Sequence, residues 1–417
     1  MVEIRPFHAY TPSPENAKDI AALPYDVMTT QEGKELTKNN PLSFLHVEKA
    51  SVDLPDNVNE HSMEVHQKAK ANLETLINQK KLVKTNTPCI YLYQQIMGKH
   101  KQLGVVTVTS VKEYDQNIIK KHELTREDKE LDRTQHIDTV SANTGPVFLT
   151  YKNKPNLDLL LAKLISDKPL IEFTSDDNIK HTLWVISDSE AIQSISKEFA
   201  QIPCLYIADG HHRTAAASNV ARIRKEKNKS HDGTEPYNYF LSVIFPDNQV
   251  NVMEYNRAVK TMNGFTRATL LAKLKEKFEI SPVIVSNPEE AKPKHRACFT
   301  MFIEGVWYYL RTKPEFVPKN SPVESLDVSI LQNEILEPLF NITNPRTDKN
   351  LEFIGGIRGM RELVKRCQED CKIGFALHPT GVDQLMQIAD AGEIMPPKST
   401  WFEPKLRSGL FVNFLEE

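Results

Sequence analysis

Short apolar runs rich in β-branched and aromatic residues recur along this sequence, and they place the tightest limit on its fold. They occur in pairs, and each pair flanks a short polar turn, at 98–101, 246–248 and 304–305. Such pairs predict β-hairpins over 89–111, 239–259 and 296–312. Helical patterns such as 59–84 lie between the pairs. We therefore expect an α+β fold with mixed and antiparallel sheets and interspersed helices.

The bulk properties narrow the class of protein. A chain of 417 residues predicts more than one domain, which we place at 1–255 and 256–417. The net charge of −3 argues against nucleic acid as a partner. No apolar run reaches the roughly 18 residues that a membrane-spanning helix needs. The cysteines are five in number and scattered, which favours reduced thiols and a cytoplasmic location.

One short stretch changes character in a way that suggests chemistry. The apolar run 204–208 predicts a strand, and the Ala-rich run from residue 213 predicts a helix. Between them lie Asp209, Gly210, His211, His212 and Arg213. The first N–H groups of a helix lack partners, glycine lets a ligand approach the backbone, and arginine binds an oxyanion with two donors. This turn therefore predicts a phosphate or nucleotide site.

Two other interpretations of the turn stay open. Asp209 is equally suited to cap the helix, which is a common role of aspartate before a helix. A metal site is the second alternative, although adjacent histidines lack the four-residue spacing that places two ligands on one helix face.

Two further polar clusters are candidates for the same site. The segment 118–149 contains His122, Glu123, Arg126 and Arg133, and the first two follow an apolar run where a strand would end. A carboxylate there could accept a hydroxyl proton, and the cations could hold phosphate oxygens. Surface ion pairs on a helix are the alternative. The third cluster is the Pro-rich loop 395–409, where Lys398, Ser399 and Thr400 suit an anionic substrate.

Several long motifs resemble the bacterial family known as domain of unknown function 1015. They are EIRPFHAYTPSPENAKDIAALPYDVMT, NPLSFLHV, IIKKHELTREDKELDR, NTGPVFLTY, LYIADGHHRTAAA and the segment LHPTG to KLRSGL. The family is distantly similar to ParB/sulfiredoxin-like proteins, among them the free-serine kinases. The resemblance implies a ParB/sulfiredoxin-like core elaborated by insertions.

The resemblance also implies an activity. It suggests a phosphotransferase that interconverts L-serine and O-phospho-L-serine with ATP or ADP and Mg²⁺, and that could run toward serine for serine biosynthesis. Gly210 and Arg213, with His122, Arg126 and Arg133, would bind phosphate or nucleotide. Glu123, Asp209, His211 and His212 would be catalytic, and Asp209 would also bind the metal. Phosphoserine hydrolysis and a non-catalytic nucleotide-dependent switch stay open, and so does a homodimer.

Overall fold

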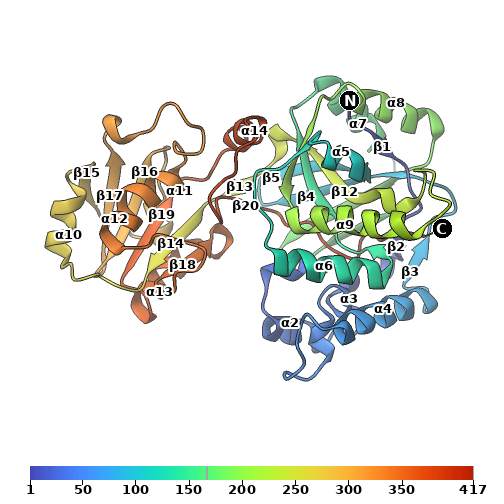
Figure 1. Cartoon of the computed structure of the whole chain (residues 1–417), viewed down its shortest axis with the longest axis horizontal. Helices are drawn as coiled ribbons and strands as arrows, with labels where there is room; N and C mark the ends of the chain where they lie inside the picture. Colours follow the sequence, from blue (N-terminus) through green and yellow to red (C-terminus); the bar gives the residue numbers. More distant parts are fainter. Residues whose placement is uncertain (166–167, 417) are drawn as a thin grey trace. The chain divides into compact units, whose positions relative to one another are not determined.

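The computed structural model describes residues 1–165 and 168–416. The chain forms two compact units (Figure 1). The first unit consists of Met1–Val250 and the chain from Pro404 onward, and the second unit is Asn251–Glu403. The division expected from the sequence, 1–255 and 256–417, stays a prediction. Helices and strands alternate in both units, and the sheets are mixed or antiparallel, which confirms the α+β class.

A mixed sheet forms the centre of the first unit. Its order is β6-β11-β8-β12-β5-β4-β10-β9, with β1 paired to β5. The β11–β6 and β12–β8 pairs are parallel and the others are antiparallel. The strands of this unit are β1 (Ile4–Arg5), β2 (Tyr10–Pro12), β3 (Leu82–Lys84), β4 (Ile90–Met97), β5 (His100–Ser110), β6 (Ile119–Lys120), β7 (Ala142–Asn143), β8 (Val147–Tyr151), β9 (Ile171–Thr174), β10 (Ile179–Ile186), β11 (Leu205–Asp209), β12 (Tyr239–Pro246) and β21 (Asn413–Phe414).

The first unit also contains α-helices. They are α1 (Ala17–Ile20), α2 (Thr30–Thr37), α3 (Leu45–Glu48), α4 (Met63–Asn78), α5 (Val111–Asp115), α6 (Glu127–Val140), α7 (Pro155–Leu164), α8 (Ser189–Phe199) and α9 (His211–Lys227). Figure 1 shows α9 lying across the sheet with α6 beside it. Ala215–Ala217 and Ala221 of α9 are buried in the main core of this unit, and α9 contacts β8 and β12. Small side chains let the helix lie close to the sheet.

The second unit contains an antiparallel sheet of order β15-β17-β16-β19-β14-β18 and the pair β13-β20. Its strands are β13 (Val252–Met253), β14 (Tyr255–Val259), β15 (Phe278–Val283), β16 (Cys298–Ile303), β17 (Val306–Thr312), β18 (Leu351–Gly355), β19 (Ile373–Leu377) and β20 (Trp401–Phe402). Its helices are α10 (Arg267–Leu274), α11 (Asp327–Leu331), the π-helical segment η8 (Gln332–Leu336), α12 (Glu337–Phe340), α13 (Gly359–Glu369) and α14 (Val382–Asp390).

Short 3₁₀ helices complete both units. They are η1 (Pro14–Asn16), η2 (Tyr25–Val27), η3 (Ala50–Asp53), η4 (Pro236–Asn238), η5 (Asp247–Gln249), η6 (Pro288–Ala291), η7 (Pro314–Phe316) and η9 (Gly356–Arg358). Among residues 1–165 and 168–416, no helix has the length and apolar character needed to cross a bilayer.

Two of the three expected hairpins are present. β4 and β5 pair as far as Met97 and His100, so Gly98 and Lys99 form the turn, and Gly98 has a φ of 58°. The hairpin of β16 and β17 closes at Ile303 and Val306.

The prediction of a hairpin over 239–259 is wrong. β12 pairs with β5 and β8 in the first unit, whereas β14 pairs with β18 and β19 in the second unit. β5 and β8 occupy both edges of β12, so β14 has no free edge of β12 to pair with. The chain after the turn at 246–248 therefore joins a different sheet.

Candidate functional site

The Asp209 turn is built as the sequence predicts. β11 ends at Asp209, and α9 begins at His211. Gly210, between them, has a φ of 102°, a left-handed conformation that glycine adopts readily and other residues rarely adopt. The pairing of β11 with β8 shifts by one residue between Ile207 and Asp209, so the end of the strand is bulged. Asp209 therefore lies at the end of the strand, immediately before the first turn of a long helix.

Asp209 forms an ion pair with a residue far away in the sequence. Lys405 Nζ lies 3.1 Å from Asp209 Oδ2, and the lysine side chain is only 9% exposed. Burial by itself would raise the pKa of Asp209, but the positive charges of Lys405 and Arg213 outweigh burial and hold the pKa well below its usual range. Asp209 is therefore a permanent anion that is already neutralised by neighbouring cations.

The two histidines of the turn attach a neighbouring loop to α9. The loop 121–126 connects β6 to α6. The backbone N–H of His122 donates to His211 Nε2 at 3.4 Å. The backbone N–H of Arg126 donates to His212 Nε2 at 3.0 Å. This arrangement explains why two histidines stand side by side at the start of the helix.

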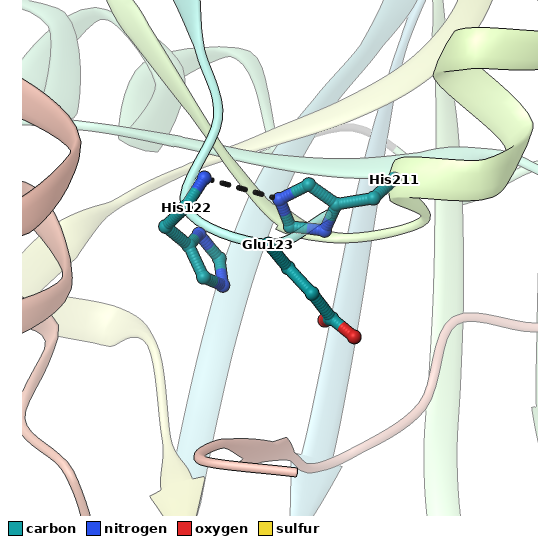
Figure 2. A group of neighbouring side chains, drawn as sticks. All are labelled: His122, Glu123 and His211. Atoms are coloured by element: carbon teal, nitrogen blue, oxygen red, sulfur yellow. Dashed lines mark hydrogen bonds between the residues drawn. The ribbon is translucent and has the colours of Figure 1, made fainter. Parts of the chain in front are cut away.

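His122 and His211 also contact each other directly, edge to face, with their ring centroids 4.4 Å apart. Burial lowers the pKa of His122 to about 4, against the opposing effect of Asp209. Burial, reinforced by the proximity of His122, lowers the pKa of His211 well below its usual range. Both rings are consequently neutral at pH 7. Because His211 Nε2 accepts the N–H of His122 (Figure 2), the neutral His211 ring carries its proton on Nδ1.

Arg213 is the buried cation of the site. It is 8% exposed, and its Nη1 donates to the carbonyl of Pro146. Its Nη2 is buried and has no hydrogen-bond acceptor in the described part of the chain; Asp26 Oδ2 lies 3.7 Å away. Burial alone would lower the pKa of Arg213, but Asp26 and Asp209 more than compensate and raise it. The guanidinium is therefore always charged, with one donor unused.

A small cavity of about 20 Å³ adjoins this guanidinium. A second arginine reaches it: Arg133 lies over the ring of Tyr25, with 4.1 Å from guanidinium carbon to ring centroid, and donates to the carbonyl of Glu48 at 3.3 Å. Glu48 is 3% exposed, and its Oε1 has no hydrogen-bond donor among the described residues. The residues that line the cavity are Tyr25, Glu48, Arg133, His136, Ile137, Asn143, Thr144, Gly145, Val147, Arg213, Phe240 and Leu241. An unused donor and an unused acceptor therefore lie on the residues of one cavity.

The structure brings most of the predicted site residues of the first unit into two groups, and the side chain of Arg126 belongs to neither. His122, Glu123 and His211 have nitrogen and oxygen atoms within 4.8 Å of one another, and Arg133 and Arg213 line the same cavity. Arg126 differs, because its guanidinium is bonded to the adjacent Asp128 at 2.7 Å and is largely exposed. Its backbone, rather than its side chain, meets the site.

Lys398, Ser399 and Thr400 belong to the second unit. Arg257 Nη2 donates to the carbonyl of Lys398 at 3.0 Å, and Thr380 Oγ1 donates to the carbonyl of Ser399 at 2.9 Å. The proposed role of these residues in substrate binding stays a prediction.

Sequence reasoning missed three contributors: Tyr25, Asp26 and Glu48. Tyr25 and Asp26 lie within one of the motifs that carry the family resemblance, which was the available signal. Nothing in their spacing pointed to Arg213, which follows them by almost 190 residues, because no local pattern encodes a contact over that distance. Glu48 ends the short helix α3, whose pattern is typical of packing only.

Comparison with known proteins places the chain in a family. The family model described as a protein of unknown function, DUF1015, matches residues 4–329, so the chain belongs to the DUF1015 family. No curated protein matches the sequence.

Solved structures give weak similarities. A free serine kinase in complex with AMP is 14% identical at a TM-score of 0.34, covering 72% of this chain and 86% of that one. SbnI with C-terminal truncation, from Staphylococcus aureus, is 11% identical at a TM-score of 0.37, covering 74% and 87%. A conserved hypothetical protein from Pyrococcus furiosus is 15% identical at a TM-score of 0.34, covering 75% and 95%. TM-scores this low carry no argument about the site.

Proposed function

We propose that the first unit is a phosphotransferase that interconverts L-serine and O-phospho-L-serine with an adenine nucleotide. The observation that carries this proposal is the buried guanidinium of Arg213, whose Nη2 makes no hydrogen bond, beside the first N–H groups of α9, which receive no side-chain cap from Gly210. A buried donor that makes no hydrogen bond costs about 1–3 kcal/mol, and an anion that accepts from it removes that cost. Phosphate is the anion that helix amides and arginine bind together.

The cavity supports a ligand that carries both signs of charge. Arg213 supplies positive charge there, whereas the guanidinium of Arg133 is already paired with Asp132 at 2.7 Å. The buried carboxylate oxygen of Glu48 is the matching acceptor for an ammonium group. A cavity of about 20 Å³ has room for one small polar group. A phosphorylated amino acid carries an ammonium group and an anion on one short molecule; one of these groups could enter the cavity, and the rest of the molecule would lie outside it.

The reaction would move one phosphoryl group. The serine hydroxyl oxygen forms a bond to the terminal phosphorus of the nucleotide, the bond from that phosphorus to the nucleotide oxygen breaks, and the hydroxyl proton passes to the Glu123 carboxylate. Arg213 and the amides at the start of α9 hold the phosphate oxygens. The reverse reaction uses the same groups and returns the proton from Glu123.

Magnesium, when bound to the nucleotide, would neutralise phosphate charge. Asp209 does not fit as its protein ligand, because Lys405 Nζ lies 3.1 Å from its carboxylate and Arg213 adds a second positive charge. A dication at that position would face two cations. We assign Asp209 instead to holding Lys405 and Arg213 in place.

The test is an assay of the purified protein with phosphoserine, with and without ADP. We expect ATP to form only when ADP is present. Free phosphate without ADP would show hydrolysis instead, and no reaction in either direction would favour a non-catalytic nucleotide-dependent switch.

Two variants assign the roles. Arg213→Lys keeps the charge but removes the fork of donors, and we expect it to weaken phosphoserine binding and lower turnover by about 10²-fold or more. The matched control is Arg222→Lys on the same helix, where Arg222 is exposed and forms an ion pair with Glu226 at 3.7 Å. Equal activity of Arg213→Lys and the control would show that the phosphate binds elsewhere.

The second variant is Glu123→Gln, which we expect to leave nucleotide affinity intact and to lower the rate by about 10²–10⁴-fold. Glu127→Gln, at the exposed start of α6, is its control. Normal turnover in Glu123→Gln would show that another group is the base.

A further inference from the structure

Four consecutive backbone carbonyls in the loop 396–399 of the second unit accept hydrogen bonds from side chains. The hydroxyl groups of Ser399 and Thr380 donate to the first and the last of these carbonyls, at 2.7 and 2.9 Å. Nη2 of Arg257 donates to the two carbonyls between them, at 3.3 and 3.0 Å. Side chains therefore fix the backbone of this loop at every residue.

This anchoring holds Lys398 in a conformation that residues other than glycine rarely adopt. Its φ is 56°, in the left-handed region. Backbone strain of this kind persists only where the surroundings fix it, and it is common at binding and catalytic sites. Lys398 is exposed, and its Nζ lies 5.7 Å from the centre of the Tyr255 ring. A rigid and strained backbone thus presents an ammonium group to solvent.

Arg257, which anchors the centre of this loop, is a buried cation without a carboxylate partner. It lies on β14 and is 4% exposed. Among the residues that the structure describes, it contacts backbone carbonyls and aromatic rings and forms no ion pair. The other buried arginines of this part of the chain, Arg133, Arg213 and Arg407, each face an aspartate. Because charged side chains are almost never buried unless they are paired, Arg257 still calls for a counterion.

Arg257 is charged at neutral pH and has hydrogen-bonding capacity to spare. Burial lowers its pKa to about 9, against the opposing effect of the Tyr255 phenol, so the guanidinium is protonated at pH 7. A guanidinium has five N–H donors. Within the described chain its acceptors are the two loop carbonyls and the carbonyl of Tyr255, which lies 2.7 Å from Nη1. The donors outnumber these acceptors, so an anion can accept from those that are left.

We propose that Arg257 and Lys398 form a site for the phosphate group of a small molecule. Both cations lie beside the ring of Tyr255, at 5.8 and 5.7 Å from its centre, and Arg257 binds the carbonyl of Lys398. A phosphate monoester carries about 1.5 to 2 negative charges at pH 7 and three acceptor oxygens, which matches two cations. A carboxylate would neutralise only one of them. Lys398 supplies the accessible contact, and Arg257 supplies the buried charge.

This site goes beyond the proposed function, because all of its residues belong to the second unit. It also changes the set of anion ligands that the sequence suggests for this loop. Ser399 is buried and donates its hydroxyl proton within the loop. We therefore assign Arg257, rather than Ser399, as the partner of Lys398.

The experiment measures how far phosphate protects Lys398 of the full chain from an amine-acetylating reagent. The reaction is run with inorganic phosphate, or with chloride at the same ionic strength, and peptide mass spectrometry gives the rates at Lys398 and at Lys349. Lys349 is an exposed lysine of the same unit, and the ratio of the two rates corrects for reagent that a probe consumes. We expect phosphate at ten times its Kd to slow Lys398 about tenfold and to leave Lys349 unchanged.

Two further probes identify the molecule that carries the phosphate. O-phosphoserine and ADP replace inorganic phosphate in the same reaction, and the probe that protects Lys398 at the lowest concentration is the source. Arg257→Met removes the buried charge, and we expect it to abolish the protection. Arg311→Met is the matched control, at an exposed position of β17 in the same unit, and it should be protected as the parent is.

Equal reactivity of Lys398 in phosphate and in chloride would overturn the proposal, and so would equal protection of Lys349 or protection that survives Arg257→Met. If Arg257→Met fails to fold by circular dichroism, the comparison of Lys398 with Lys349 in the parent decides alone. The outcome is separate from the phosphoserine assay. A chain that protects Lys398 and transfers no phosphate keeps this site and contradicts the phosphotransferase, and the reverse result does the opposite.

Discussion

At the scale of single residues, the ion pair of Asp209 and Lys405 decides how the turn before α9 is held. The two residues are 196 positions apart, and the lysine is nearly buried, so each charge depends on the other. Removing one member of a buried pair leaves an uncompensated charge, which typically costs about 3–5 kcal/mol, whereas removing both members costs much less.

This pair gives a prediction about stability. We expect Lys405→Met to lower the free energy of unfolding by about 1–3 kcal/mol, a discounted range because Asp209 is partly exposed. The double variant Asp209→Asn with Lys405→Met should recover most of that loss. Urea unfolding of the parent and the variants measures both. A double variant that is less stable than Lys405→Met would contradict the ion-pair explanation.

A buried carboxyl away from the site gives a pH-dependence. Burial raises the pKa of Glu113 from 4.5 to about 7, and one of its oxygens accepts the backbone N–H of Glu3 at 2.9 Å. Between these two pH values the folded chain binds a proton that the unfolded chain releases. The contribution of this group to stability is therefore present below pH 4.5 and is lost as the pH rises to about 7.

Glu113→Gln keeps the acceptor and removes the ionisation. We expect the variant to exceed the parent in unfolding free energy by about 1–3 kcal/mol at pH 8, and the difference to shrink toward zero near pH 4.5. Denaturant unfolding at several pH values, with the exposed Glu127→Gln as control, measures this. A difference that does not change with pH would show that Glu113 does not titrate in this range.

The sequence reveals the part of the site that a local pattern encodes, but not the residues that reach the site through long-range contacts. Asp209, Gly210 and Arg213 could be predicted because a strand, a tight turn and a helix are encoded within 24 consecutive residues, 204–227. The partner of Asp209 could not, since Lys405 lies in a Pro-rich segment whose polar residues suit an anion equally well. Glu48 and Asp26 were missed for the same reason.

At the scale of elements, β5 shows how tightly the central sheet is packed. Gly104 lies in this strand, and a Cβ atom there would come within 2.6 Å of Val243 Cγ1 and 2.7 Å of the Phe245 ring, both on β12. These distances are too short for real contacts, so the strand or its neighbour would have to shift. Overpacking of this kind typically costs about 1–3 kcal/mol.

Gly104→Ala should therefore lower the free energy of unfolding by about that amount, although alanine is the better strand residue by propensity. Lys101→Ala, at an exposed position of the same strand, should change stability little. Thermal and urea unfolding of both variants compare them. Unchanged or increased stability in Gly104→Ala would mean that the side chains of β12 move aside without cost.

The strands also show which pairings a sequence pattern can predict and which it cannot. The hairpins β4–β5 and β16–β17 could be predicted because the pairing of each is set by its own turn. The run 239–259 has the same pattern, yet β12 and β14 find partners in different sheets. Pairing across a chain excursion depends on which strand edges are already taken, and the sequence around the turn contains no such information.

At the scale of the whole molecule, the end of the chain belongs to the first unit. β21 pairs with β7, and Val412 exchanges backbone hydrogen bonds of 3.0 Å with Tyr10. Arg407 forms an ion pair with Asp177, and the carbonyl of Lys405 accepts from Gln95 at 2.9 Å. Residues 404–416 thus complete the first unit after the chain has built the second.

The second unit begins and ends at adjacent points. The backbone N–H of Glu403 donates to the carbonyl of Asn251 at 3.2 Å, and β13 pairs with β20 just inside these ends. The two points at which the chain leaves and re-enters the first unit are therefore close enough for a short turn to join them. This is the geometry in which insertion and removal of a segment are tolerated.

We accordingly expect a chain in which a short Gly/Ser turn replaces residues 251–403 to fold cooperatively. A chain that ends at Glu403 should instead lose the fold of the first unit, because it loses β21 and Lys405 while keeping all of the second unit. Circular dichroism and urea unfolding compare the two. A stable first unit in the truncated chain would show that the returning segment contributes little, and an unfolded chain after excision would show that the first unit depends on the second.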